Sequence, residues 1–165
     1  MNVLFLCVDC LRQDFVVSDR ADTPFLDELV SDGVYFSNMY STTTTTTPCV
    51  ASFMTGCYSE KNGVNSHSYS ELDDDVETLA GVLGENGYST YAMATGPLVT
   101  ETSLDRGFDS YWYRDRNKNL AGEWGTTARE KLSQLEDPFF LYMHLWELHG
   151  PIEVSPEYDS AAYGK

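Results

Sequence analysis

The sequence predicts an α/β fold built around a mainly parallel sheet. Two continuous apolar runs, at residues 2–8 and 138–146, are typical of strands buried on both faces of such a sheet. Strand-like runs alternate with helical patterns along the chain, as they do where helices join parallel strands. The 165 residues contain no internal repeat and no Pro/Gly/Ser-rich linker, so we expect one domain over residues 1–165.

The first third of the chain predicts a strand, a helix, a second strand and a short helix. After the strand at 2–8, a helix is expected over 23–33, with Thr23 as N-cap, Pro24 at the first position and Gly33 as the stop. Its apolar face would comprise Phe25, Leu26, Leu29 and Val30. Alternation then predicts a strand at 34–40, and a short helix should run from Pro48 to Met54.

The rest of the chain continues the alternation. A helix is expected over 74–87, with acidic residues in its first turn and Leu79, Val82 and Leu83 as its buried stripe. The remaining expected elements are a strand at 88–94, a loop or short strand within 104–112, a helix at 124–135 and a last strand at 138–146.

The charge of the chain restricts the classes of molecule that it can bind. Asp and Glu number 26 against 10 Lys and Arg, a net charge of −16, which repels nucleic-acid phosphates. Spread acidic residues suit a salt-rich cytoplasm that screens their repulsion, so a halophilic source is a hypothesis. Residues 2–8 are too short to span a bilayer and no basic leader precedes them, so we expect a soluble cytoplasmic protein that does not bind membranes.

The pair Cys7 and Cys10 has the spacing of a redox motif or of half a zinc site. Cys7, however, lies inside the first apolar strand, and no second such pair completes a zinc ribbon. Four cysteines are also too few for a disulfide scaffold in a domain of this size. We therefore interpret the pair as structural cysteines.

Three positions could carry chemistry. Asp9 ends the first strand, where a helix cap is the simpler interpretation and a metal ligand the alternative. Residues 42–47 are six threonines before Pro48, at a predicted helix N-terminus that would favour a tetrahedral anion. A hydroxyl there could attack phosphorus or sulfur beside a metal, although spacing alone favours a capping role. His149 follows the last strand in a Gly-Pro loop, whereas His144 lies within that strand and should be packed.

Six segments, taken in order, resemble the sulfatase family of the alkaline phosphatase superfamily. They are NVLFLCVDCLRQD, TPFLDELVSDGVYFSNMYS, TTPCVASFMTGCYSEKNGV, TLAGVLGENGYSTYAM, RGFDSYW and FFLYMHLWELHGP. No single segment is specific, but the ordered set is. The resemblance implies an alkaline phosphatase-like three-layer sandwich, of which residues 1–165 would be the N-terminal portion of the catalytic domain.

The resemblance also implies roles for three residues. The family nucleophile stands two positions before the proline of the third segment, which selects Thr46. Asp9 matches the N-terminal metal ligand, and Thr46 would share that ion. His149 matches a histidine that faces the metal or the anionic group of the substrate. A divalent ion, either Ca, Zn, Mn or Mg, is therefore expected as cofactor.

The chain also departs from the family pattern. A threonine cannot become the formylglycine of the best-known sulfatases, Val50 stands where those enzymes have arginine, and Cys10 replaces a second aspartate found in many members. The segment YAMATGP carries neither the lysine nor the histidine usual there. These departures favour direct attack by Thr46, as in phosphatase, phosphodiesterase and phosphonate-hydrolase relatives, and they leave the choice of sulfate or phosphate ester open.

Family members are much longer, and their downstream half supplies an Asp-His pair that has no counterpart here. We therefore expect a truncated domain with an exposed sheet edge, pairing as a homodimer. The hypothesis is a metal-dependent hydrolase of small sulfate or phosphate esters whose site is incomplete in this chain, so that the isolated chain is inactive. The alternative is a non-catalytic binding or assembly module that retains the fold.

Overall fold

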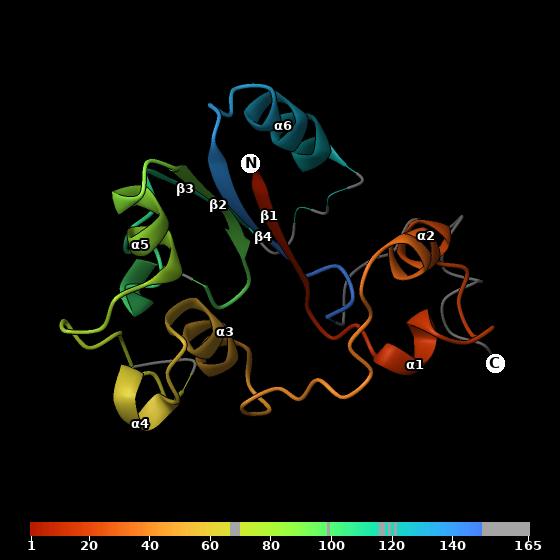
Figure 1. The fold of residues 1–165 in the computed structure, drawn as a ribbon, viewed down its shortest axis with the longest axis horizontal. Helices are drawn as coiled ribbons and strands as arrows, with labels where there is room; N and C mark the ends of the chain where they lie inside the picture. The colour runs from red at the N-terminus through yellow and green to blue at the C-terminus, as the bar shows by residue number, and fades with distance from the viewer. Residues whose placement is uncertain (67–69, 99, 116–117, 119, 121, 150–165) are drawn as a thin grey trace.

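A four-stranded parallel sheet forms the centre of the molecule (Figure 1). The computed structural model describes residues 1–66, 70–98, 100–115, 118, 120 and 122–149. The strands are β1 (Val3–Val8), β2 (Ser89–Thr95), β3 (Ser110–Arg114) and β4 (Phe139–Leu145), in the spatial order β1-β4-β2-β3. The predicted α/β class with a parallel sheet is therefore confirmed.

Helices cover both faces of this sheet. Phe140 and Tyr142 of β4 pack with the helices α3 (Thr46–Thr55) and α5 (Leu79–Glu85), in a core that continues through Ala92. Leu141, which points the opposite way, packs with Ala128 of α6 (Glu123–Leu132). The three layers follow from the period-two alternation of side chains along a strand. β4 is buried on both faces, as its apolar sequence predicts.

The expectation that β1 is buried on both faces is wrong. Leu4 is 59% exposed and Leu6 is 37% exposed, whereas Phe5 packs on Phe53 and Tyr142. Among the described residues β1 pairs with β4 alone and lies at the edge of the sheet. The apolar composition of β1 is that of an interior strand, but its position leaves one face and one hydrogen-bonding edge uncovered.

The segment after β1 also differs from expectation. The helix α1 (Gln13–Val16) is followed by α2 (Pro24–Asp32), which agrees with the predicted helix. The strand predicted at 34–40 is wrong, because the backbone there is irregular. Its apolar side chains are exposed, and so is the stripe of α2, with Phe25 64% and Leu29 51% exposed. Figure 1 shows α1 and α2 beyond the end of β1, away from the other helices.

The fifth helix is shorter than predicted. α5 begins at Leu79 because Thr78 caps it, accepting a hydrogen bond of 3.0 Å from the Gly81 N–H. The acidic residues 73–75 precede the helix, and Val82 is exposed, so those two expectations are wrong. The short helices α4 (Ser59–Asn62) and η1 (Thr100–Thr102) complete the described elements. Within the described part of the chain, no helix combines the length and apolar character needed to cross a membrane.

Candidate functional site

Asp9 and His149 lie at the same edge of the sheet. Parallel pairing sets Val8 of β1 beside Leu145 of β4, so both strands end together. The Asp9 N–H donates a 2.9 Å hydrogen bond to the Leu145 carbonyl, which anchors the residue that follows β1. The carboxyl edge of a parallel sheet is where ligands bind in open α/β folds. The loop that carries His149 leaves β4 at this edge.

Thr46 lies beside Asp9. It is the first residue of α3, and its hydroxyl Oγ1 donates a 3.0 Å hydrogen bond to Asp9 Oδ2. At this end of the helix the dipole is positive, and Pro48 lies in the first turn, where its missing N–H costs no hydrogen bond. The arrangement therefore combines a hydroxyl, a carboxylate and an electropositive helix terminus.

Cys10 and His149 form a group with Asp9 in which all three side chains are of types that can bind a metal ion. One ligand atom from each of the three lies within 4.8 Å of the other two. Cys10 is exposed and has a φ of 60°, in the turn that follows β1, where the Leu11 N–H donates to the Val8 carbonyl. Among the residues that the structure describes, this is the one such group of histidine, cysteine and acidic side chains.

His144 lies behind Asp9, inside the protein. The residue is 2% exposed, as predicted for a packed histidine, and its Nε2 lies 3.8 Å from Asp9 Oδ2. Within the described residues neither ring nitrogen has a hydrogen-bond partner. Burial lowers the pKa of His144 to about 4, against the opposing effect of the Asp9 charge, so the ring is neutral near pH 7.

Trp146 supports the His149 ring. The two rings are stacked, with centroids 3.9 Å apart and an interplanar angle of 11°. Gly96 leaves space for the indole, because a Cβ there would lie 2.5 Å from the Trp146 ring. Tyr113 donates a 2.7 Å hydrogen bond to the Gly96 carbonyl and holds this glycine at the end of β2. Gly96 and Trp146 thus limit where the His149 imidazole can lie.

The loop that follows β4 and carries His149 is held by a buried ion pair. The guanidinium of Arg114, 3% exposed, binds both carboxylate oxygens of Glu147, and the Leu120 N–H donates to Glu147 Oε1 at 2.8 Å. Burial raises the pKa of Glu147, but the hydrogen bonds from Arg114 and Leu120 outweigh it, so the pKa is lowered overall. The Arg114 guanidinium also lies over the ring of Trp124, with its carbon 5.0 Å from the ring centroid. This clamp joins the end of β3 to the His149 loop.

The structural interpretation of the cysteine pair agrees with the position of Cys7 but is wrong for Cys10, which is exposed. All four cysteines are free thiols, and Cys7 packs against the main core. Burial and the Asp9 charge raise the pKa of Cys7 to about 11, and the same two causes raise the pKa of Cys10. A redox pair requires a lowered thiol pKa, so a thioredoxin-like role is not supported.

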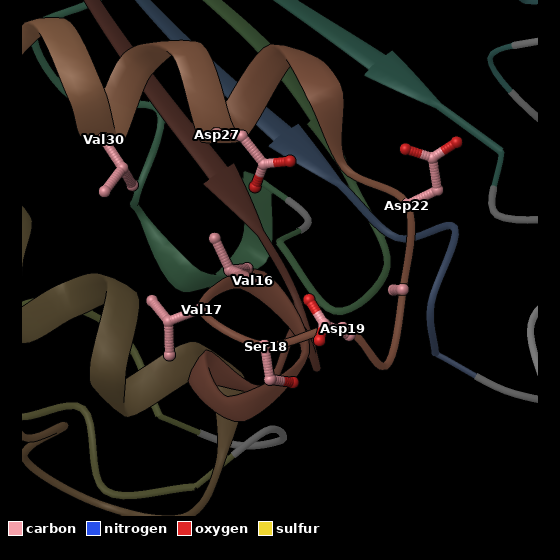
Figure 2. Close-up of a pocket in the computed structure, with 8 residues that line it drawn as sticks. Val16, Val17, Ser18, Asp19, Asp22, Asp27 and Val30 are labelled. Carbon is pink, nitrogen blue, oxygen red and sulfur yellow. The ribbon is translucent and has the colours of Figure 1, made fainter.

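A separate hollow of about 650 Å³ lies between α1 and α2. Figure 2 shows Val16, Val17 and Val30 on its walls, with Asp19, Asp22 and Asp27 around it. Neither Asp9 nor Thr46 lines this hollow, which is open to solvent. Its carboxylates are also too far apart to qualify as a metal-binding group among the described residues.

The sequence alone identified only part of the site. It indicated Asp9, Thr46 and His149 but did not connect Gly96, Trp146 or Arg114 with them. The alternation of β4 places residues 140, 142 and 144 on one face, which is a usable signal that His144 points toward the α3 side. No comparable signal identifies Gly96, because its role depends on a ring 50 residues away in the chain. The third histidine, His67, is in a polar stretch of the sequence and lies outside the described residues.

Comparison with known proteins places this geometry in context. The model of the sulfatase family matches residues 1–165. An N-acetylglucosamine-6-O-sulfatase of Bacteroides thetaiotaomicron is 30% identical over 114 residues, which are 67% of this chain and 20% of that protein. An N-acetylgalactosamine-6-O-sulfatase of the same organism is 36% identical over 107 residues, 54% of this chain and 21% of that protein. Human arylsulfatase G is 32% identical over 102 residues, 58% of this chain and 19% of that protein.

Solved structures share the fold. A protein solved with its substrate D-glucosamine-2-N,6-O-disulfate superposes with a TM-score of 0.74 at 21% identity, over 95% of this chain and 36% of that one. The phosphonate monoester hydrolase of Agrobacterium radiobacter gives 0.75 at 18% identity, over 95% of this chain and 43% of that one. The chain thus spans about a fifth of the curated relatives it matches and less than half of these two structures.

Proposed function

Because the chain belongs to the sulfatase family, we propose that it carries one part of the active site of a sulfate-ester hydrolase. The observation that supports this proposal most is the contact between Thr46 Oγ1 and Asp9 Oδ2 at the N-terminus of α3. It brings a nucleophilic hydroxyl, a carboxylate and the positive end of a helix dipole to the carboxyl edge of the sheet. The remaining part of the site would come from sequence that residues 1–165 do not include.

Thr46 is proposed as the nucleophile. Its Oγ1–H group points at Asp9 Oδ2, so the carboxylate lies where the hydroxyl proton would leave. Oγ1 would form a bond to the sulfur while the bond from sulfur to the alcohol oxygen breaks, and the alcohol would depart with a proton. Water would then hydrolyse the resulting threonyl ester. The α3 N-terminus would hold the negatively charged oxygens of the ester.

The residues present fit a divalent cation. Asp9, the Thr46 hydroxyl and His149 supply oxygen and nitrogen donors at one point, and the buried, unpartnered His144 ring faces the same carboxylate. A divalent ion held there by Asp9 and Thr46 would lower the pKa of the hydroxyl and offset the charge of the ester oxygens. His149, held by the Trp146 ring, would contact the anionic group of the substrate or the ion itself.

The substrate class is proposed from the relatives. The matched curated proteins are named as sulfatases, two of them acting on 6-O-sulfated amino sugars, so a small anionic sulfate ester is the first candidate. A phosphate ester is the second, because the residue at the nucleophile position is a threonine, which cannot become formylglycine. The fold shared with a phosphonate monoester hydrolase is compatible with either ester.

The test compares Thr46→Ala with Thr45→Ala in the full polypeptide that contains residues 1–165. Thr45 is the neighbouring N-cap, and its side chain makes no capping hydrogen bond, so it is a matched control. Aryl sulfate and aryl phosphate would be assayed with each divalent metal. We expect Thr46→Ala to lose turnover at least about a hundredfold and Thr45→Ala to retain it. Full activity of Thr46→Ala would contradict the assignment of Thr46 as nucleophile. The ratio of the turnover rates on aryl sulfate and aryl phosphate identifies the ester.

The proposed homodimer uses the edge of β1. Leu4 and Leu6 are exposed there, and the strand has a partner on one side alone among the described residues. An unpaired strand edge with apolar side chains pairs readily with another chain. Sedimentation at increasing concentration should show a dimer that Leu4→Lys abolishes. A monomer at every concentration contradicts the dimer.

A further inference from the structure

We propose that Cys10 is a thiolate ligand of the metal ion, together with Asp9 and His149, and that the site selects zinc over calcium and magnesium. The proposal rests on the metal-dependent function above and adds to it the identity of a third ligand and the class of the ion. It differs from the all-oxygen site that a second aspartate at position 10 would form.

The three side chains lie close enough together to share one ion. A carboxylate oxygen of Asp9, the Cys10 sulfur and a ring nitrogen of His149 all lie within 4.8 Å of one another. Zinc lies about 2.3 Å from sulfur and about 2.0 Å from a histidine nitrogen, so two donors that share one ion are roughly 4 Å apart or less. Side-chain rotations alone can close that difference, because Cys10 is exposed and not packed in the core.

The donor atoms of these side chains are of the kinds that zinc prefers. Calcium and magnesium take oxygen ligands and have little affinity for thiolate or imidazole. Zinc takes sulfur, nitrogen and oxygen together, in sites of three or four protein ligands. With Asp9, Cys10, His149 and the Thr46 hydroxyl, this chain supplies one donor set of mixed type. Asp9 and Thr46 alone would hold an oxygen-seeking ion weakly.

A third, independent observation concerns His144. Its side chain is fully buried, its Nε2 lies 3.8 Å from Asp9 Oδ2, and neither ring nitrogen has a partner within the described part of the chain. An unpaired buried polar group is costly and requires an explanation. Carboxylates that bind metals are held by outer hydrogen-bond donors, and a neutral imidazole facing the protein side of Asp9 can be such a donor. The position of the His144 ring indicates that Asp9 Oδ2 belongs to a ligand-binding site.

The two cysteines of the sequence pair have different environments. Cys10 is exposed and belongs to the group with Asp9 and His149. Cys7, by contrast, packs in the core and is not among the three side chains of the group. The sequence pair therefore divides into one structural thiol and one ligand.

The experiment is a cobalt titration of the reduced, metal-free chain, followed by absorption spectroscopy. Cobalt(II) reports a bound thiolate by a charge-transfer band in the near ultraviolet and its coordination by bands in the visible. We expect both for the unchanged chain and for Cys57→Ser, a control thiol outside the group. Cys10→Ser should lose the charge-transfer band, and His149→Gln should weaken cobalt binding about tenfold or more. Circular dichroism checks that each variant is folded.

The outcomes separate this inference from the proposed function. Visible bands without a charge-transfer band in the unchanged chain would mean that a metal site exists without Cys10, which overturns the inference and leaves the proposed function standing. A charge-transfer band that survives in Cys10→Ser also overturns the inference. No cobalt binding at all overturns the inference, whereas the proposed function is tested separately by the turnover of Thr46→Ala. Zinc should displace cobalt when added in equal amount, whereas displacement by calcium or magnesium as readily as by zinc would refute the selectivity.

Discussion

Thr46 Oγ1 donates its hydrogen bond to Asp9 Oδ2 across 3.0 Å, although 37 positions separate the two residues in the chain. The contact joins the end of an edge strand to the beginning of a helix that packs on the sheet. Both residues become part of one site because α3 is held against the sheet by its buried residues, among them Val50, Ala51 and Met54. The predictions below concern this site and the contacts that support it.

Asp9→Asn should weaken metal binding without weakening the fold. The amide oxygen still accepts the Thr46 hydrogen bond, but the negative charge that attracts a cation is gone. We expect the affinity for a divalent ion, measured by titration calorimetry, to fall about tenfold or more. Asp14→Asn is the control, since that exposed carboxylate pairs with Arg12 and Arg20 outside the site. Equal losses in both variants would show that bulk charge, not the site, determines binding.

Gly96→Ala should destabilise the protein by about 2–4 kcal/mol. The new methyl group would lie 2.5 Å from the Trp146 ring, at a φ of +72° that disfavours any side chain. Gly56→Ala provides the control, since Gly56 has a φ of +67° but no atom within 4 Å of its Cβ position. It should lose roughly 1–2 kcal/mol, the backbone cost alone. Urea unfolding measures both, and equal losses would mean that the Trp146 contact is unimportant.

Arg114→Ala should cost about 3–5 kcal/mol of unfolding free energy. It leaves the Glu147 carboxylate, 28% exposed, without its main partner and removes the contact with Trp124. Lys61→Ala breaks the exposed ion pair with Asp75, where both side chains are more than 60% exposed, and should cost less than about 1 kcal/mol. Chemical unfolding of the two variants tests the difference. A loss below about 1 kcal/mol for Arg114→Ala would contradict the clamp.

Stability should fall at alkaline pH because of Tyr111. Burial raises the pKa of Tyr111 above its ordinary value of 10, and its hydroxyl donates a 2.9 Å hydrogen bond to the Leu98 carbonyl. Since the folded-state pKa is the higher one, this stabilisation is present below pH 10 and is lost as pH rises above it. Tyr111→Phe should cost about 1 kcal/mol near pH 7 and lose less stability in alkali. An identical pH profile for both proteins would exclude Tyr111 as the cause.

Salt should stabilise the chain. A net charge of −16 makes the compact state repel itself in dilute buffer, and screening removes that repulsion. We expect the unfolding temperature to rise between about 0.1 M and about 2 M potassium chloride, where the screening length falls from about 10 Å to less than 3 Å. Sodium and potassium chloride should act alike, as expected for screening. Full stability in dilute buffer would refute the halophilic hypothesis.

Local sequence was sufficient for much of the fold. The apolar run of β4 and the capped pattern of α2 agree with the structure because hydrophobic periodicity and helix-boundary residues act within a few positions of each other. The segment at 34–40 alternates as a strand does but has no described neighbour to pair with, so its apolar side chains remain exposed. A strand forms only where another strand pairs with it, and the local sequence does not determine whether one lies beside it.

The candidate site, like the fold, could be predicted only in part from the sequence. The resemblance to the sulfatase family selected Asp9, Thr46 and His149 as a set, and each of them lies near the end of an element that the sequence predicts. The sequence could not place His144 behind Asp9, Trp146 against His149 or Gly96 beneath Trp146. Those contacts depend on the register of β1 with β4 and on loops that meet at one edge of the sheet. Sequence by itself therefore determined the class of fold and the candidate residues, whereas tertiary structure alone decided their distances and burial, since both arise from contacts between segments far apart in the chain.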